Sequence, residues 1–103
     1  MAETKTTTTT KKQAAEVTSR FLHQETQTIE GVEYTFQFPG TRRTQEILDE
    51  SKNIDGVLVD AKYNELLMAE VIVSPQTDWD YWDKTKGYRE VMQAADLFLG
   101  NQL

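Results

Sequence analysis

The residues in this sequence that could do chemistry are mainly carboxylates. Asp78, Asp80 and Asp83 lie within one stretch of six residues, a density of oxygen ligands that would suit a hard cation such as calcium. An EF-hand calcium loop also requires a glycine and a distal glutamate at fixed positions, and this stretch has neither. We therefore interpret Asp78 and Asp80 as residues that stabilise the N-terminus of a helix, and we predict no metal site.

Other reactive residue types are scarce. The chain has no cysteine, which excludes disulfides and thiolate metal sites, and its one histidine, His23, has no metal-ligand partner at helical spacing. Arg42 and Arg43 could hold an anion at a helix N-terminus, although such a pair is usually solvated. No glycine-rich nucleotide loop is present. We predict a protein that is not an enzyme and that uses no cofactor.

Length and charge narrow the class of protein further. The 103 residues give room for one compact domain, and 17 acidic against 11 basic residues give a net charge of −6. Residues 1–43 carry +1 and residues 44–103 carry −7. Because an acidic body repels phosphates, we expect neither nucleic acid nor an anionic membrane as a partner. The sequence has no apolar run of roughly 20 residues and no signal-peptide core, so we expect a soluble protein that stays where it is made.

The elements that must position these residues begin after a polar tail. Residues 1–13 contain five consecutive threonines between lysines and no anchoring apolar residue, so we predict a disordered tail followed by one small α+β domain over residues 14–103. Residues 14–24 have loosely helical apolar spacing and could form a nascent helix or a partner-binding arm.

A β-hairpin is the first firm prediction within that domain. Apolar and polar residues alternate over residues 28–38, with Val32, Tyr34, Phe36 and Phe38 on one face, which is typical of a strand. Glu30 and Gly31 fit the turn that connects it to a first strand at residues 27–29. The Pro39–Gly40 pair should end the second strand.

Three or four short helices are predicted after the hairpin. Residues 41–52 form the first, with Thr41 as its N-cap, and a second begins at the N-cap Asp60. Residues 71–73 could be extended before Pro75. Residues 77–80 resemble a capping box that begins at Thr77. An apolar stripe with helical spacing then runs from Tyr88 to Leu99, and Gly100 is expected to end that helix.

The aromatic residues are the best candidates for binding. Trp79, Tyr81, Trp82 and Tyr88 lie close together before the last helix, and Met92 follows one turn later. Tyrosine and tryptophan are enriched in binding hot spots, but a domain this small also needs its large residues for a core, so both roles stay open. We predict a partner-binding site at Trp79, Tyr81, Trp82, Tyr88 and Met92. Of these residues, Tyr81 is expected to face outward.

The second half of the chain also carries a family resemblance. The string ELLMAEVIVSP at residues 65–75, an aromatic and acidic turn, and the string VMQAADLFLG at residues 91–100 resemble the tail assembly chaperones of long-tailed bacteriophages of Gram-positive hosts. The upstream strand that ends in FQFPG at residues 36–40 is similar too. The resemblance covers about residues 28–103, and its motifs are hydrophobic patterns with a Ser-Pro rather than a catalytic signature.

The resemblance implies a transient assembly factor in the bacterial host cytoplasm. Such a protein would bind the long apolar helix of the tape measure protein, with the major tail protein as a second candidate partner, and would self-associate. A virion structural component, such as a head–tail connector or a minor tail protein, is the main alternative. An acidic inhibitor that mimics nucleic acid is a third, although the acidic residues here are interspersed with lysines.

Overall fold

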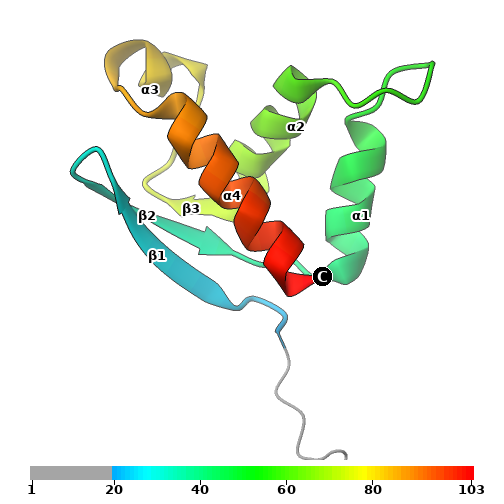
Figure 1. Cartoon of the computed structure of the whole chain (residues 1–103), viewed down its shortest axis with the longest axis horizontal. Coiled ribbons are helices and arrows are strands. Elements are labelled where there is room, and N and C mark those ends of the chain that lie inside the picture. Colours follow the sequence, from blue (N-terminus) through cyan, green and yellow to red (C-terminus); the bar gives the residue numbers. More distant parts are fainter. Residues whose placement is uncertain (1–19) are drawn as a thin grey trace, which may run out of the picture.

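The computed structural model describes residues 20–103, so the predicted disordered tail lies outside the described residues. The fold is α+β: a three-stranded antiparallel sheet in the order β1-β2-β3 carries the helices on one face (Figure 1). This confirms the predicted fold class. The elements are β1 (Gln24–Ile29), β2 (Val32–Gln37), α1 (Thr41–Glu50), α2 (Asp60–Leu66), the π-helical turn η1 (Leu67–Val71), β3 (Ile72–Ser74), α3 (Trp79–Lys84) and α4 (Tyr88–Gln102).

The hairpin forms where the alternating pattern predicts it. Strands β1 and β2 pair from Gln24↔Gln37 to Ile29↔Val32, and the two-residue turn between them has positive φ at Glu30 and Gly31. Those positive φ angles fit the turn types that match the twist of a hairpin. Strand β1 is thus longer than the predicted residues 27–29.

Of the two alternatives for residues 14–24, a nascent helix or a partner-binding arm, the helix does not form at residues 20–24, which are the part that the structure describes. Phe21 and Leu22 form a turn, and Gln24 already belongs to β1. The Phe38 backbone N–H donates to the His23 carbonyl at 2.9 Å, and the Leu22 N–H donates to the Phe38 carbonyl at 2.8 Å. These non-local bonds continue the hairpin ladder, so they replace the local bonds that a short helix would make.

Strand β3 completes the sheet on the side of β2 away from β1. Thr35 pairs with Ser74 and Phe36 with Ile72, with a register shift between the two pairs. The predicted extended segment thus begins at Ile72. Val71 instead belongs to η1, whose wider turn buries Leu67, Met68 and Val71 together.

Helix boundaries differ from the sequence expectations mainly at the caps. Gly40 and Val59 precede α1 and α2, so Thr41 and Asp60 are first helical residues rather than N-caps. The cap of α3 is Asp78, whose carboxylate accepts the Tyr81 backbone N–H at 2.8 Å, and not Thr77. Gly100 does not end α4, which continues to Gln102, because Gly100 does not adopt the positive φ that a glycine at a helix C-terminus usually has.

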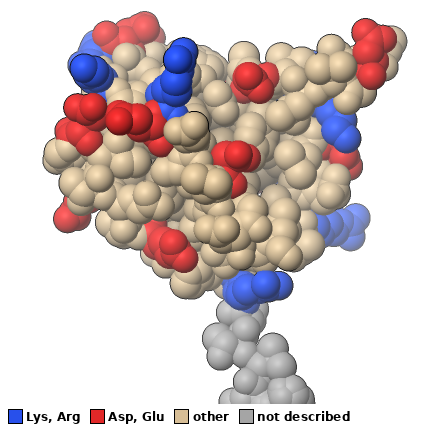
Figure 2. All heavy atoms as spheres, viewed as in Figure 1, with Lys and Arg blue, Asp and Glu red and all other residues tan. Residues whose placement is uncertain are grey.

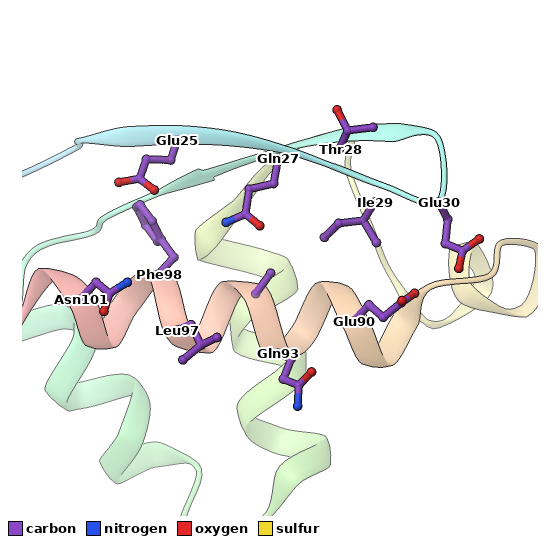
Figure 3. Close-up of a pocket in the computed structure, with 11 residues that line it drawn as sticks. Glu25, Gln27, Thr28, Ile29, Glu30, Glu90, Gln93, Leu97, Phe98 and Asn101 are labelled. Atoms are coloured by element: carbon purple, nitrogen blue, oxygen red, sulfur yellow. The ribbon is translucent and has the colours of Figure 1, made fainter.

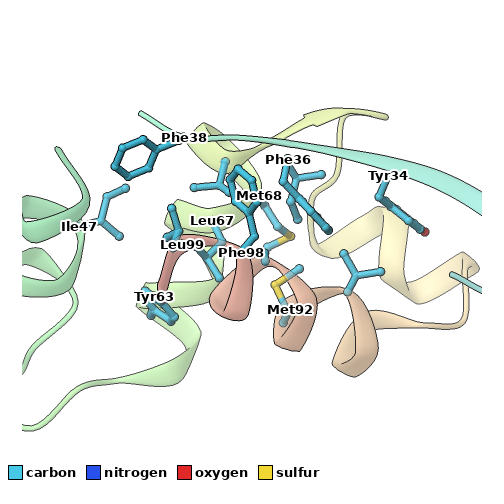
Figure 4. Packing of buried hydrophobic residues seen from close by; sticks show 14 residues of the cluster. Tyr34, Phe36, Phe38, Ile47, Tyr63, Leu67, Met68, Met92, Phe98 and Leu99 are labelled. Carbon is cyan, nitrogen blue, oxygen red and sulfur yellow. The ribbon is translucent and has the colours of Figure 1, made fainter. Parts of the chain in front are cut away.

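The core lies between the sheet and the helices (Figure 4). Tyr34 and Phe36 contribute to this core from β2, where the Phe36 ring lies 5.9 Å from that of Phe98 on α4. Phe38 directly follows β2, and its ring lies beside Ile47 of α1. The buried apolar residues are Tyr34, Phe36, Phe38, Ile47, Tyr63, Leu67, Met68, Val71, Ile72, Val91, Met92, Ala95, Phe98 and Leu99. The alternating residues of the hairpin and the apolar stripe of the last helix, which were the two clearest patterns in the sequence, therefore line the same core.

A network of charged side chains connects α1 to η1. Arg43 Nε donates to Glu70 Oε1 at 2.7 Å and Arg43 Nη2 to Glu70 Oε2 at 2.5 Å, a bidentate pair. Arg43 Nη1 also reaches Glu50 at 2.8 Å and Glu46 at 3.2 Å. The Arg43 guanidinium holds the pKa of Glu70 below its ordinary value of 4.5. Arg43 thus has a structural role here.

We expect Glu70→Gln to lower the free energy of unfolding by about 1 kcal/mol at pH 7. The Glu70 carboxylate has a lower pKa in the folded state than in the unfolded state, so it stabilises the fold above pH 4.5. This stabilisation is lost as the pH falls below that value, and the variant should lose less stability there. Urea denaturation at pH 7, 4 and 3 measures both effects. Glu65→Gln, on the exposed face of α2, is the control, and an equal response of the two variants would contradict the prediction.

Candidate interaction surfaces

The predicted aromatic site is assembled by α3 and the start of α4. Trp79 lies 5.8 Å from Tyr88 between ring centroids, and Trp82 lies 5.8 Å from Tyr88 and 4.7 Å from Tyr81. Gly87, with φ at 117°, makes the sharp turn between the two helices that allows these contacts. The structure thus brings the four predicted aromatic residues into one cluster.

Most of this cluster faces inward. The Tyr81 hydroxyl shares a hydrogen bond of 2.8 Å with the hydroxyl of Tyr34, which is fully buried on β2. Burial, and then the bond to Tyr81, raise the pKa of Tyr34, so the Tyr34 hydroxyl stays neutral at physiological pH. The prediction that Tyr81 faces outward is wrong, because a bond to a residue 47 positions away could not be seen in the local spacing.

Trp79 is the aromatic residue of the cluster that is exposed, at 41%. Trp82 stacks on Tyr34 and donates its indole N–H to the Met68 sulfur at 3.1 Å, while Met92 is only 5% exposed. The Tyr88 hydroxyl accepts a hydrogen bond of 2.7 Å from the Asn64 side chain on α2. Of the predicted partner-binding residues, only Trp79 offers a large accessible surface. Tyr81 and Trp82 connect α3 to the sheet and to η1, Tyr88 connects α4 to α2, and Met92 belongs to the core.

Replacing Tyr81 with phenylalanine tests this structural role. We expect Tyr81→Phe to lower the free energy of unfolding by about 1–2 kcal/mol, because the Tyr34 hydroxyl is left buried without its partner. The double variant Tyr34→Phe with Tyr81→Phe removes both hydroxyls and should recover more than half of that loss. Urea denaturation followed by circular dichroism measures all three proteins. If the double variant lost as much free energy of unfolding as the two single variants together, an unpaired buried hydroxyl could not explain the loss in Tyr81→Phe.

A more accessible surface follows the outer side of α4, where two grooves flank the helix. The first, which we call the α1–α4 groove, has a volume of about 280 Å³ and lies between α1, Tyr63 and the end of α4. Its apolar lining includes Leu48, Leu97 and Leu103, and the last two are 64% and 61% exposed. The Tyr63 hydroxyl donates to Asp96 at 2.6 Å within this lining, and burial and that bond raise the pKa of Tyr63.

Leu97 was not among the predicted site residues, although the sequence carried a signal for it. It lies nine residues after Tyr88, which at 100° per residue places it on the side of α4 opposite the buried stripe. Single exposed apolar residues are common, but Leu97 lines the same groove as Leu48 and the exposed Leu103, and a contiguous apolar patch of this kind indicates a contact surface.

The second groove, which we call the β1–α4 groove, separates the edge strand from α4 and has a volume of about 540 Å³ (Figure 3). Glu25, Gln27 and Ile29 point into it from β1, whereas Thr28 points away from α4. The α4 side contributes Glu90, Gln93, Ala94, Leu97, Phe98 and Asn101. This groove is more polar than the α1–α4 groove, and Leu97 lines both.

The charged residues singled out in the sequence do not converge. Asp78, Asp80 and Asp83 are all exposed on or beside α3, and Asp78 is used as its cap. His23 bonds to Glu25 at 3.0 Å and stacks on Phe98, with 6.2 Å between the ring centroids. Within residues 20–103 no group of three His, Cys, Asp or Glu side chains is placed to hold a metal ion.

Figure 2 shows acidic and basic side chains interspersed on one face, with wide uncharged areas between them. In the part of the chain that the structure describes, no helix has the length and apolar character needed to cross a membrane.

No protein-family model, no curated protein and no solved structure matches this chain.

Proposed function

We propose that this chain is a non-enzymatic tail assembly chaperone of a long-tailed bacteriophage. In this role it would bind the tape measure protein and keep it soluble in the cytoplasm of the bacterial host until the tail tube forms around it. The proposal rests on the resemblance of residues 28–103 to that family, together with one feature of the structure. That feature is the α1–α4 groove, where Leu97 and Leu103 are largely exposed beside Leu48.

The chemistry of this groove suits an apolar helix. Amphipathic helices bind by laying an apolar face into a groove lined by aliphatic side chains, and the three leucines supply such a lining. The net charge of −6 would keep the complex soluble, because like-charged complexes repel one another. The tape measure protein is long, helical and apolar, so it needs both properties in a chaperone.

Co-expression with the tape measure protein tests the proposal. We expect the tape measure protein to become soluble and to co-purify with this chain, and Leu103→Asp to reduce the recovered complex about tenfold, because a carboxylate would have to be buried in the groove. Ile54→Asp makes the same kind of change at a fully exposed residue of the loop between α1 and α2, and it should have little effect. A tape measure protein that stays insoluble without forming a complex would contradict the proposal.

The same experiment separates the groove from the aromatic cluster. Trp79→Ala removes the exposed ring of that cluster and touches neither groove. If Trp79→Ala abolishes binding and Leu103→Asp does not, the partner binds at the start of α3 instead. A chaperone should also be absent from purified virions, whereas a head–tail connector or a minor tail protein would be retained in them.

A further inference from the structure

The edge strand β1 has an unprotected row of backbone hydrogen-bonding groups. In the hairpin, Glu25, Gln27 and Ile29 lie opposite Phe36, Tyr34 and Val32, and the two-residue turn makes these the pairs that exchange backbone bonds. The backbone N–H and C=O groups of Gln24, Thr26 and Thr28 therefore point away from β2. No other strand within residues 20–103 lies on that side, because the sheet order is β1-β2-β3.

Natural proteins usually protect such an edge with a short strand, a proline, a lysine or a bulge. The opposite edge of this sheet follows that rule, because β3 has only three residues and is followed by Pro75. Strand β1 has six residues with one charged side chain, Glu25, and with no proline and no lysine, and its pairing with β2 has no register shift. The difference between the two edges indicates that β1 is suited to receive another strand.

We infer that two copies of this chain pair through antiparallel β1 strands, around a two-fold axis at Thr26, to form one six-stranded sheet. This register places Gln24 opposite Thr28 of the second copy, and Glu25 opposite Gln27 of the second copy. No carboxylate then lies directly opposite another, and each Glu25 meets an amide that can donate to it.

The face of the sheet that carries no helices supports the same register. Thr26 and Thr35 already share a hydroxyl hydrogen bond of 3.0 Å across β1 and β2. The two-fold axis would extend this pair into a row of four threonines across four strands, and threonine pairs between neighbouring strands are favourable.

The face of the sheet that carries the helices explains why the strand that pairs with β1 comes from a second copy of this chain. A two-fold axis perpendicular to the sheet keeps both α4 helices on one side of it, so the β1–α4 grooves of the two copies join beneath the paired strands. Leu97, which lines this groove and is largely exposed, would face Leu97 of the second copy across the shared space. Apolar contact there adds to the backbone bonds of the edge. The inference does not depend on the partner proposed above.

Sedimentation velocity of the full chain over a range of concentrations tests the inference. We expect a monomer–dimer equilibrium that Thr26→Glu weakens at least about tenfold, because two carboxylates would lie side by side at the axis. Thr35→Glu is the matched control: it adds the same charge to the same face and breaks the same hydroxyl pair, but it lies one strand away from the axis. It should weaken the dimer less than about threefold.

Disulfide cross-linking tests the register directly, since the natural chain has no cysteine. Oxidation of Thr26→Cys should give a covalent dimer, because directly paired strand residues have Cα atoms about 5.5 Å apart, within disulfide range. Thr35→Cys should give no covalent dimer under the same conditions. A chain that is monomeric at every concentration would overturn the inference, and so would a dimer that Thr26→Glu leaves intact or that cross-links equally through Thr35→Cys.

Discussion

Replacing Phe36 with alanine should lower the free energy of unfolding by about 3–5 kcal/mol, a large part of the stability of a domain this size. Phe36 is fully buried on β2, the central strand, and its ring lies 5.9 Å from that of Phe98 on α4. The substitution removes the aromatic contact that joins the sheet to the helix and leaves a cavity that neither element can close alone, because both are held by their own backbone bonds.

Urea denaturation of Phe36→Ala, followed by circular dichroism, measures this loss. Ile54→Ala is the control, because Ile54 is fully exposed in the loop between α1 and α2 and its truncation should change the free energy of unfolding by less than about 0.5 kcal/mol. If Phe36→Ala lost less than about 1 kcal/mol, Phe36 could not be central to the core.

Gly40→Ala is expected to have the second largest effect, a loss of about 2–3 kcal/mol. Gly40 has φ 100° and ψ 157°, a backbone conformation that is almost restricted to glycine. An added Cβ would also lie 3.2 Å from Cδ1 of Phe21. The Gly40 carbonyl accepts both the backbone N–H and the hydroxyl of Thr44, at 3.0 and 2.7 Å, so a change of its conformation would disturb the start of α1.

Gly31→Ala separates the backbone effect from the contact with Phe21. Gly31 also has a positive φ, 78°, but an added Cβ there would meet no atom within 4 Å. It should therefore lose only about 1 kcal/mol, the usual penalty for alanine in a left-handed conformation. Equal losses at Gly31 and Gly40, measured by urea denaturation, would contradict the explanation given for Gly40.

The parts of the fold that could be predicted are those that local periodicity determines. The alternation from Val32 to Phe38 predicts β2 and its buried face, and the spacing from Tyr88 to Leu99 predicts α4 and its buried stripe. Each pattern continues over several residues, so one residue that departs from it does not change the assignment of the segment as a strand or a helix. The turn at Gly31 could be predicted because a positive φ angle favours glycine.

The remaining features depend on contacts between residues distant in the sequence. The pairing of Phe36 with Ile72 and the bond between Tyr34 and Tyr81 both require the folded arrangement of several elements. The candidate site illustrates this most clearly. The aromatic spacing predicted a cluster, which does form, but it could not predict which ring faces solvent, because the buried Tyr34 that draws Tyr81 inward lies on another element.

The two tryptophans lie only three residues apart, yet they have different surroundings. Trp82 is partly buried against Tyr34 and Met68, whereas Trp79 is exposed at the start of α3. In fluorescence, Trp79 should emit at the longer wavelength and be open to a soluble quencher, while Trp82 should be shielded from it. The natural chain therefore carries two optical reporters, one for events at the surface of α3 and one for the packing beneath it.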